Sequence, residues 1–219
     1  MTEKIDSIEI YVDTSDRIAQ INDIGEKELK SIWERFYSKY KDFTKFFCYH
    51  NTNAIPFKLL DEFGATLVDD CVEMRLSSDK LTYAKLHDIR LVTYGDYDDF
   101  ASYHDEHNPD MAWTSERIKS DLSRWAIFTY DIERTIAGYL LLSMWNPVES
   151  EIFCVDSNNI EQCEALISYA AKYALDSGKK SVLFMADENS AGHKAALSIG
   201  FSTTGFYKGF KIGRISNDT

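Results

Sequence analysis

The densest group of reactive side chains lies in the segment DYDDFASYHDEH, residues 96–107. It holds five carboxylates and no lysine or arginine. His104 and His107 have the H-x-x-H spacing that places two imidazoles one helical turn apart. Zinc usually takes three or four protein ligands, and no third is apparent here, so we expect no metal site. The carboxylates could attract a cationic amine or form a solvated acidic helix face, and we favour the solvated face.

Cysteine spacing and charge exclude several classes of protein. The four cysteines show no C-x-x-C or zinc spacing, and residues 1–7 lack the apolar core of a signal peptide, so we expect reduced thiols in a cytoplasmic protein. The formal charge is −12 and no basic stripe occurs, so nucleic acid is not an expected partner. The most apolar stretch, residues 136–145, is too short to span a bilayer, so no membrane partner is expected.

A weak internal repeat organises the chain. TNAIPFKLLDEFGA at residues 52–65 resembles ENSAGHKAALSIGF at residues 188–201, with an offset of 136 residues. The same offset aligns further segments, namely 24–42 with 160–178, 46–50 with 182–186, and 72–76 with 208–212. YVDT at 11–14 matches CVDS at 154–157 with an offset of 143. Each copy therefore predicts strand, loop, helix, strand, helix, glycine and hairpin, with the longer loop in the first copy at residues 14–23.

The second copy is preceded by further structure. An alternating strand is predicted at 89–94, helices at 97–108 and 114–124, and a hairpin from 125–131 and 135–145. The strand at 151–156 then begins the second copy. Residues 77–88 form the expected boundary, which gives domains of 1–80 and 85–219.

This order of elements, ending in N-x-x-A/G-x-K-x-x-x-x-x-G-F, resembles the GNAT superfamily of N-acyltransferases. Asn189, Gly200 and Phe201 carry the match. The resemblance covers about residues 89–214 and implies an α/β (α+β) fold: a mixed, mostly antiparallel sheet flanked by helices. Residues 1–80 then resemble a truncated GNAT half. In the last helix we expect Asn189 to cap the start, Gly200 to be left-handed past the end, and Phe201 to be buried.

The resemblance implies an N-acetyltransferase that uses acetyl-CoA and a small amine. By position, the backbone N–H groups of Cys154 and Val155 would bind the acetyl carbonyl. The pyrophosphate would lie at the helix start in residues 156–166. There Asn158 takes the family's Gln/Arg position, Gln162 begins an alternative register, and Asn159 or Asn158 is expected to cap the helix.

The pyrophosphate segment departs from the family's pattern. Neither register restores the family's two glycines, because Glu161 and Cys163 or Ala165 and Ile167 stand in their places. Glu161 also brings a charge that repels phosphate. QINDIG at residues 20–25 of the first copy fits a glycine loop more closely, although six residues can match by chance.

The catalytic residues implied by the resemblance also differ. The family's usual tyrosine acid is replaced by Ala196, and His193, one turn earlier, is the substitute candidate. Glu149 and Glu151 are candidates for the general base on the fourth strand, and we assign Glu151. Each of these three residues also fits a solvated surface position. Asn189 at the last helix is assigned to cofactor binding.

Two functions remain open on sequence alone. The first is an active N-acetyltransferase, and the alternative is a catalytically degenerate GNAT-fold protein that binds a ligand or partner. A homodimer is possible, and the sequence does not determine the oligomeric state.

Overall fold

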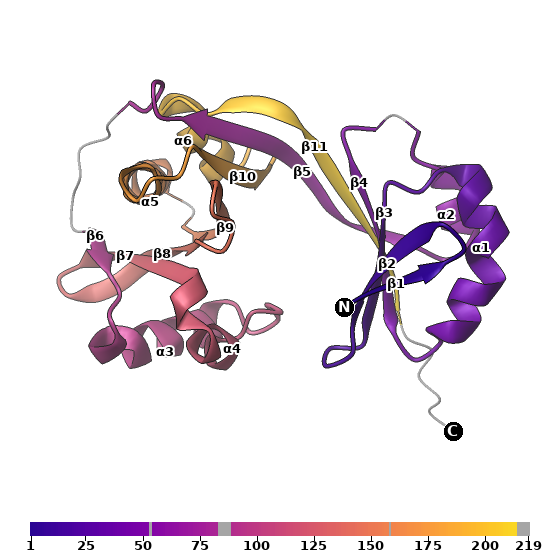
Figure 1. The fold of residues 1–219 in the computed structure, drawn as a ribbon. Coiled ribbons are helices and arrows are strands. Elements are labelled where there is room, and N and C mark those ends of the chain that lie inside the picture. The colour runs from indigo at the N-terminus through magenta and orange to yellow at the C-terminus, as the bar shows by residue number, and fades with distance from the viewer. Residues whose placement is uncertain (53, 83–88, 158, 214–219) are drawn as a thin grey trace. The chain divides into compact units, whose positions relative to one another are not determined.

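The chain folds into two compact units. The computed structural model describes residues 1–52, 54–82, 89–157 and 159–213 (Figure 1). One unit comprises residues 1–71 with 205–219, and the other comprises residues 72–204. The division falls within two long strands, β5 (Thr66–Ser77) and β11 (Ser202–Ile212), so each unit contains part of both.

The first unit is a sheet with two helices on one face. Its elements are β1 (Thr2–Ile5), β2 (Ile8–Asp13), β3 (Ile18–Asn22), α1 (Glu26–Lys39), β4 (Thr44–His50) and α2 (Phe57–Glu62). The strands lie in the order β1-β2-β3-β4-β11. β3 and β4 are parallel because α1 connects them, whereas β11 runs antiparallel to β4. Leu29, Ile32 and Phe36 form the buried stripe of α1.

The second unit is a sheet with helices on both faces. Its elements are β6 (Ile89–Leu91), the 3₁₀ helix η1 (Tyr94–Asp96), α3 (Tyr97–His107), α4 (Ser115–Ser120), the 3₁₀ helix η2 (Leu122–Arg124), β7 (Trp125–Ile132), β8 (Thr135–Ser143), β9 (Glu149–Asp156), α5 (Ile160–Asp176), β10 (Ser181–Asp187) and α6 (Ala191–Ser198). Its strand order is β11-β5-β10-β9-β8-β7-β6. β9 and β10 are parallel, and β6 through β9 form an antiparallel meander.

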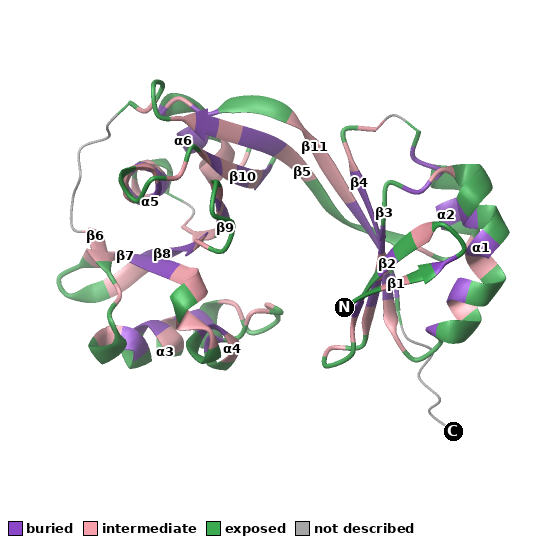
Figure 2. Cartoon of the chain, in the orientation of Figure 1, coloured by how far each residue is buried: buried purple, intermediate pink, exposed green. Residues whose placement is uncertain are grey.

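Each face of this second sheet has its own core. Helices α5 and α6 cover one face, where Leu140, Ile152, Leu166 and Phe184 are buried. Helices α3 and α4 cover the other, where Phe100, Ile127, Tyr139 and Leu141 are buried. Figure 2 shows the buried residues concentrated in the strands and on one side of each helix. The predicted fold class, a mixed and mostly antiparallel sheet flanked by helices, is confirmed.

Two local predictions are wrong. The predicted loop at residues 14–23 contains β3, and β3 rather than β2 precedes α1, so the proposed match of 11–14 with 154–157 is incorrect. The predicted terminal hairpins are single strands, β5 and β11. Gly205 and Gly209 do not turn the chain. They give space to neighbouring side chains, because a Cβ at Gly205 would lie 1.6 Å from Asn51 Oδ1 and one at Gly209 would lie 2.6 Å from Asp69 Oδ2.

The division of the chain also differs from the predicted boundary between residues 80 and 85. The last six residues of β11 pair with residues 45–50 of β4, so the C-terminal strand belongs partly to the first unit. A linear reading of the sequence misses this return of the chain. Residues 83–88 of the predicted linker, and Asn53 of the repeat, lie outside the described residues.

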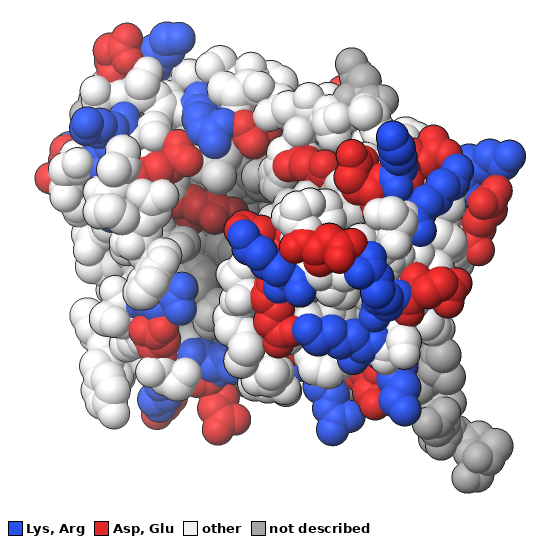
Figure 3. Space-filling model, turned by 45° about the vertical axis from the view of Figure 1, so that its right-hand side comes forward, with Lys and Arg blue, Asp and Glu red and all other residues white. Residues whose placement is uncertain are grey.

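Charged residues of both signs are interspersed on the surface shown in Figure 3. On the first unit, Lys30 pairs with Glu26, Arg35 with Asp6, and Lys39 with Glu3. Each of these three cations is therefore opposed by a carboxylate. Within the described part of the chain, no helix is long and apolar enough to cross a membrane.

Candidate functional site

β9 and β10 pair at one end and separate at the other. Their parallel ladder runs from Glu149 opposite Ser181 to Ile152 opposite Phe184, and both strands continue beyond it. A cavity of about 260 Å³ lies between the separating strands and the start of α6. We call it the β9–β10 cleft. Its lining includes Phe153, Cys154 and Val155 of β9, Met185 and Ala186 of β10, and Ala191 of α6.

A β-bulge marks the point of separation. Leu142 of β8 lies opposite Ile152 and Leu141 lies opposite Cys154, so Phe153 is an extra residue on β9. A bulge bends its strand and increases the local twist. It therefore explains why β9 leaves β10 directly after Ile152. The parallel ladder with β10 ends before Cys154 and Val155, which line the cleft, so this edge of β9 is available to an extended ligand.

The start of α5 is closed by its own side chains. Asn159 is the N-cap, and its Oδ1 accepts hydrogen bonds from Glu161 N at 2.9 Å and Gln162 N at 3.3 Å. Ser157 Oγ donates to Gln162 Oε1 at 2.7 Å. The expected cap by Asn159 is confirmed, and Asn158 lies outside the described residues. Two N–H groups that could bind a phosphate are thus already satisfied.

The start of α6 differs from the prediction. Ser190, not Asn189, is the N-cap, and its Oγ accepts from His193 N at 3.0 Å. Asn189 has φ +65°, so it forms the turn before the helix, and its N–H donates to His193 Nδ1 at 3.0 Å. Asparagine tolerates this left-handed conformation, which makes it suitable for the turn. The predicted Gly200 conformation, φ +108°, and the buried Phe201 are confirmed.

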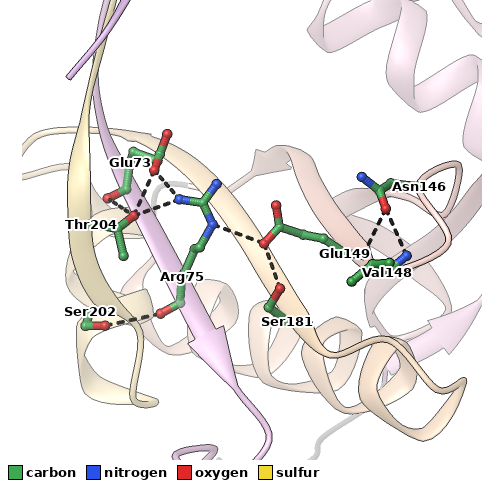
Figure 4. A network of polar contacts seen from close by, with 8 residues as sticks. All are labelled: Glu73, Arg75, Asn146, Val148, Glu149, Ser181, Ser202 and Thr204. Carbon is green, nitrogen blue, oxygen red and sulfur yellow. Dashed lines mark hydrogen bonds and ion pairs between the residues drawn. The ribbon is translucent and has the colours of Figure 1, made fainter. Parts of the chain in front are cut away.

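Glu149 belongs to a polar network at the base of β9 (Figure 4). Arg75 Nε donates to Glu149 Oε1 at 3.1 Å, and Ser181 Oγ donates to the same oxygen at 2.7 Å. Arg75 also contacts buried Glu73, and its Nη1 donates to Thr204 Oγ1 at 3.1 Å. Glu149 is therefore an ion-pair partner rather than a free carboxylate.

Glu151 is placed differently from Glu149. It lines a second cavity of about 260 Å³, together with Ser143, Trp145, Asn146, Glu149 and Leu183. We call this the Trp145 cavity. Burial raises the pKa of Glu151, and the neighbouring Glu149 charge raises it further. A half-buried carboxylate with a raised pKa in a cavity has the properties of a general base.

A buried polar network lies beside β9 on the α3 face. His104 is fully buried, its Nε2 donates to Trp113 O at 2.8 Å, and its Nδ1 lies 2.7 Å from Tyr139 Oη. Because the Trp113 carbonyl can only accept a hydrogen bond, Nε2 of His104 must carry the hydrogen. In the neutral ring Nδ1 then accepts a hydrogen bond from the Tyr139 hydroxyl. Asn108 Nδ2 and Cys154 Sγ also donate to Tyr139 Oη, at 3.0 and 3.7 Å. Burial raises the pKa of Cys154 to about 11, so this thiol is a poor nucleophile.

The acidic segment 96–107 does not form a single acidic wall. Asp96 caps η1 through Thr93, Asp98 pairs with Lys119, and Asp105 accepts from the Ser115 hydroxyl at 2.6 Å. His104 points into the core, so H-x-x-H here places one histidine inside and one outside.

Sequence reasoning missed Tyr139 and Arg75, and it considered His104 only as a possible metal ligand. For His104 a signal existed, because Tyr97, Phe100 and His104 form one apolar stripe at helical spacing. For Arg75 the signal was an arginine between Met74 and Leu76, two apolar residues that are buried. Of the assigned site residues, Cys154 and Val155 line the β9–β10 cleft and Glu151 lines the Trp145 cavity. His193 is among the lining residues of neither.

No protein-family model matches the sequence, and no curated protein matches it. Several solved structures are similar to this chain. A conserved protein of unknown function from Staphylococcus epidermidis is similar over 98% of this chain and 94% of that one, with a TM-score of 0.74 and 15% identity. A GCN5-related N-acetyltransferase from Kribbella flavida is similar over 99% and 91%, with a TM-score of 0.68 and 10% identity.

A tandem GNAT protein of the clavulanic acid biosynthesis pathway is also similar. The match covers 96% of this chain and 79% of that one, with a TM-score of 0.56 and 11% identity. At such low identity these similarities establish the fold and nothing beyond it. The chain has the GNAT fold.

Proposed function

We propose that this GNAT-fold chain is an N-acetyltransferase that moves the acetyl group of acetyl-CoA to a small amine. The separation of β9 from β10 next to Glu151 carries the proposal. Glu151 lies opposite Leu183, one pair before the ladder ends. The cleft and the carboxylate of raised pKa therefore occupy neighbouring positions on one strand.

The residues present suit one part of acetyl-CoA, its extended arm, better than another, its pyrophosphate. The edge of β9 at Cys154 and Val155, beyond the ladder with β10, suits the extended, amide-containing arm of the cofactor, which can add to β9 as a strand would. The pyrophosphate finds a poorer site, because Asn159 already caps α5 and Glu161 stands in its first turn. Asn159, Gln162 and Asn189 are the remaining residues that we propose for cofactor binding. The bound cofactor supplies an acetyl group activated as a thioester.

The chemistry assigned to the protein is proton transfer and charge stabilisation. Glu151 accepts the proton that the acceptor ammonium must lose before or during attack, and its raised pKa brings its basicity closer to that of the amine. A backbone N–H of Cys154 or Val155 donates to the carbonyl oxygen as negative charge develops there. The new C–N bond forms as the C–S bond breaks, and the thiolate takes up a proton.

His193 is the proposed source of that last proton. Its Nδ1 accepts from Asn189 N–H, so the neutral ring carries its hydrogen on Nε2. Nε2 is therefore the atom that can donate.

The remaining expectations are proposals as well. We infer that the first unit, which holds most of residues 1–80, is a truncated GNAT-like half and that the protein acts in the cytoplasm, where the thiols that the structure describes would stay reduced. The acceptor is a small amine, and neither nucleic acid nor a membrane is a proposed partner. A homodimer is a further proposal, and a measurement of the molecular mass in solution tests it.

One observation favours a second candidate function. Because Asn159 satisfies two N–H groups at the start of α5, the phosphate-binding surface of this fold is reduced. A chain that lost catalysis and kept the fold as a binding module would show the same feature.

A thermal-shift experiment with acetyl-CoA tests the proposal. Ligand at 100 times its dissociation constant should stabilise the protein by about 2.7 kcal/mol. Ala191→Phe fills the β9–β10 cleft and should abolish this stabilisation. Ala54→Phe, at an exposed position of the first unit, is the matched control and should keep it. Acetyl-CoA stabilisation that survives Ala191→Phe would contradict the assigned site, and no stabilisation at all would favour the binding module.

A further inference from the structure

The Trp145 cavity combines an exposed indole with a desolvated carboxylate. Trp145 is 69% exposed although it lies only two residues after the end of β8. Large aromatic residues usually bury most of their surface, so an ordered and exposed tryptophan in a cavity is informative.

The indole is held in place from one side. The guanidinium of Arg124 stacks on Trp145 with its Cζ 4.1 Å from the ring centroid. Arg124 O also accepts from Met144 N at 2.7 Å, one residue before the indole. One face of the ring is thus covered by a cation, and the exposed remainder is free for a ligand.

The loop that carries Trp145 is fixed by hydrogen bonds. Asn146 Oδ1 accepts from Val148 N at 2.8 Å and Glu149 N at 3.2 Å (Figure 4). Lys179 Nζ donates to Met144 O at 3.0 Å and to Asn146 O at 2.5 Å. A fixed platform binds a ligand at less entropic cost than a mobile side chain does.

The charge in the cavity selects for a cation. Arg75 is shared between Glu73 and Glu149, so its one positive charge is already opposed by two carboxylates. Lys179 and Arg124 contact the loop that carries Trp145, but neither pairs with Glu151 in any described contact, so Glu151 adds negative charge beside Glu149. A bound ammonium would supply a cation to oppose it.

The volume of the Trp145 cavity and its apolar wall restrict the size and chemical class of the acceptor. A volume of about 260 Å³ is below the 300–1,000 Å³ usual for pockets of drug-sized ligands. Leu183 adds an apolar wall from β10. We propose that this cavity is the acceptor subsite and that the acceptor is a small primary amine with a flat ring, its ammonium at Glu151 and its ring on Trp145. This assignment rests on the proposed acetyltransferase function.

Three small probes test the assignment on the full chain by isothermal titration. 2-Phenylethylamine has the ring and the ammonium, butylamine lacks the ring, and 2-phenylethanol lacks the ammonium. Titrations run with and without saturating CoA. We expect 2-phenylethylamine to bind about tenfold more tightly than either relative, because it makes both contacts. Equal affinity for all three, or no binding of 2-phenylethylamine in either condition, would overturn the assignment.

Variants separate the platform from general folding effects. Trp145→Ala should raise the dissociation constant of 2-phenylethylamine about tenfold, and Trp145→Phe only about threefold. Tyr94→Ala is the matched control, because Tyr94 is also exposed and has Lys119 Nζ 6.0 Å from its ring centroid. It should bind like wild type. If the folded Trp145→Ala variant bound 2-phenylethylamine as tightly as wild type, the proposed binding of the ring to Trp145 would be wrong.

A parallel assay of CoA thiol release distinguishes this inference from the proposed function. Trp145-dependent binding without thiol release would keep the amine subsite and contradict acetyl transfer. Thiol release that is equally fast with butylamine and unaffected by Trp145→Ala would keep the acetyltransferase and contradict the subsite.

Discussion

The chain contains two strand–helix–strand segments, β3–α1–β4 and β9–α5–β10, which share a parallel connection. Their strands differ in how far they stay paired. β3 and β4 pair along all of β3, from Ile18 opposite Thr44 to Asn22 opposite Cys48. β9 and β10 pair only as far as Ile152 and Phe184 and then separate around a cavity. A parallel β–α–β connection therefore does not by itself separate its two strands.

Two local features account for the difference. β9 has the bulge at Phe153, whereas the β2–β3 pairs from Tyr11 opposite Gln20 to Asp13 opposite Ile18 keep one register. The end of β3 is also closed by Asp23, whose N–H donates to Cys48 O and whose Oδ1 accepts from His50 N. One inserted residue separates β9 from β10, and one aspartate holds β3 to β4. The first segment has a cavity of about 780 Å³ as well, but it lies beside β2, the end of β3 and the start of α1.

The largest expected effect concerns catalysis in the second segment. Glu151→Gln should lower kcat/KM about 10²- to 10⁴-fold, because it removes the proposed base. In wild type, kcat/KM should rise with pH through the raised pKa of Glu151, and this limb should be missing in the variant. Asp23→Asn in the first segment is the control and should leave kcat/KM unchanged. Equal losses in both variants, or an intact pH limb in Glu151→Gln, would rule out this role.

The next effect concerns cofactor binding at the start of α5. Glu161→Gly removes a negative charge near the proposed pyrophosphate site and should tighten acetyl-CoA binding about tenfold. Glu26→Gly makes the same change at the first residue of α1 and should not alter binding. Isothermal titration compares the two variants, and their free energies of unfolding are measured separately because glycine weakens a helix by up to about 1 kcal/mol. Micromolar or tighter wild-type binding that Glu161→Gly leaves unchanged would place the pyrophosphate elsewhere.

A smaller effect tests the closure of the first segment. Asp23→Ala removes the acceptor for His50 N at a position with φ +48°, and should lower the free energy of unfolding by about 1–2 kcal/mol. Asp23→Asn keeps the acceptor and tolerates the left-handed conformation, so it should lose much less. Denaturant titration measures both. Similar stability of the alanine variant and wild type would show that Asp23 does not hold β3 against β4.

The smallest effect is on stability at Glu151. Because its pKa is raised, the folded state binds the proton more tightly than the unfolded state, so stability is lost as pH rises through the folded pKa. Glu151→Gln should therefore be more stable than wild type at pH 7, and the difference should vanish below about pH 4. Glu149→Gln breaks the Arg75 pair and should show no such gain. A pH-independent difference for Glu151→Gln would argue against a desolvated carboxylate.

The local patterns of the sequence were sufficient for most elements. The apolar stripe of α1, the hairpin of β7 and β8 and the glycines after α2 and α6 depend on short-range periodicity and backbone preference, so they could be predicted. The cap of α5 by Asn159 is equally local. At α6 the cap moved one residue, to Ser190, because both Asn189 and Ser190 are good capping residues and only the backbone path chooses between them.

The tertiary structure decided the features that depend on neighbouring strands. Whether residues 14–23 hold a strand depends on pairing of β3 with β4, and whether β9 leaves β10 depends on register against β8. The burial that raises the pKa of Glu151 and the contact of His104 with Tyr139 likewise depend on the tertiary structure. A single sequence determines which residues can form strands, helices and caps. It does not determine which strands become neighbours, and register and desolvation are properties of those neighbours.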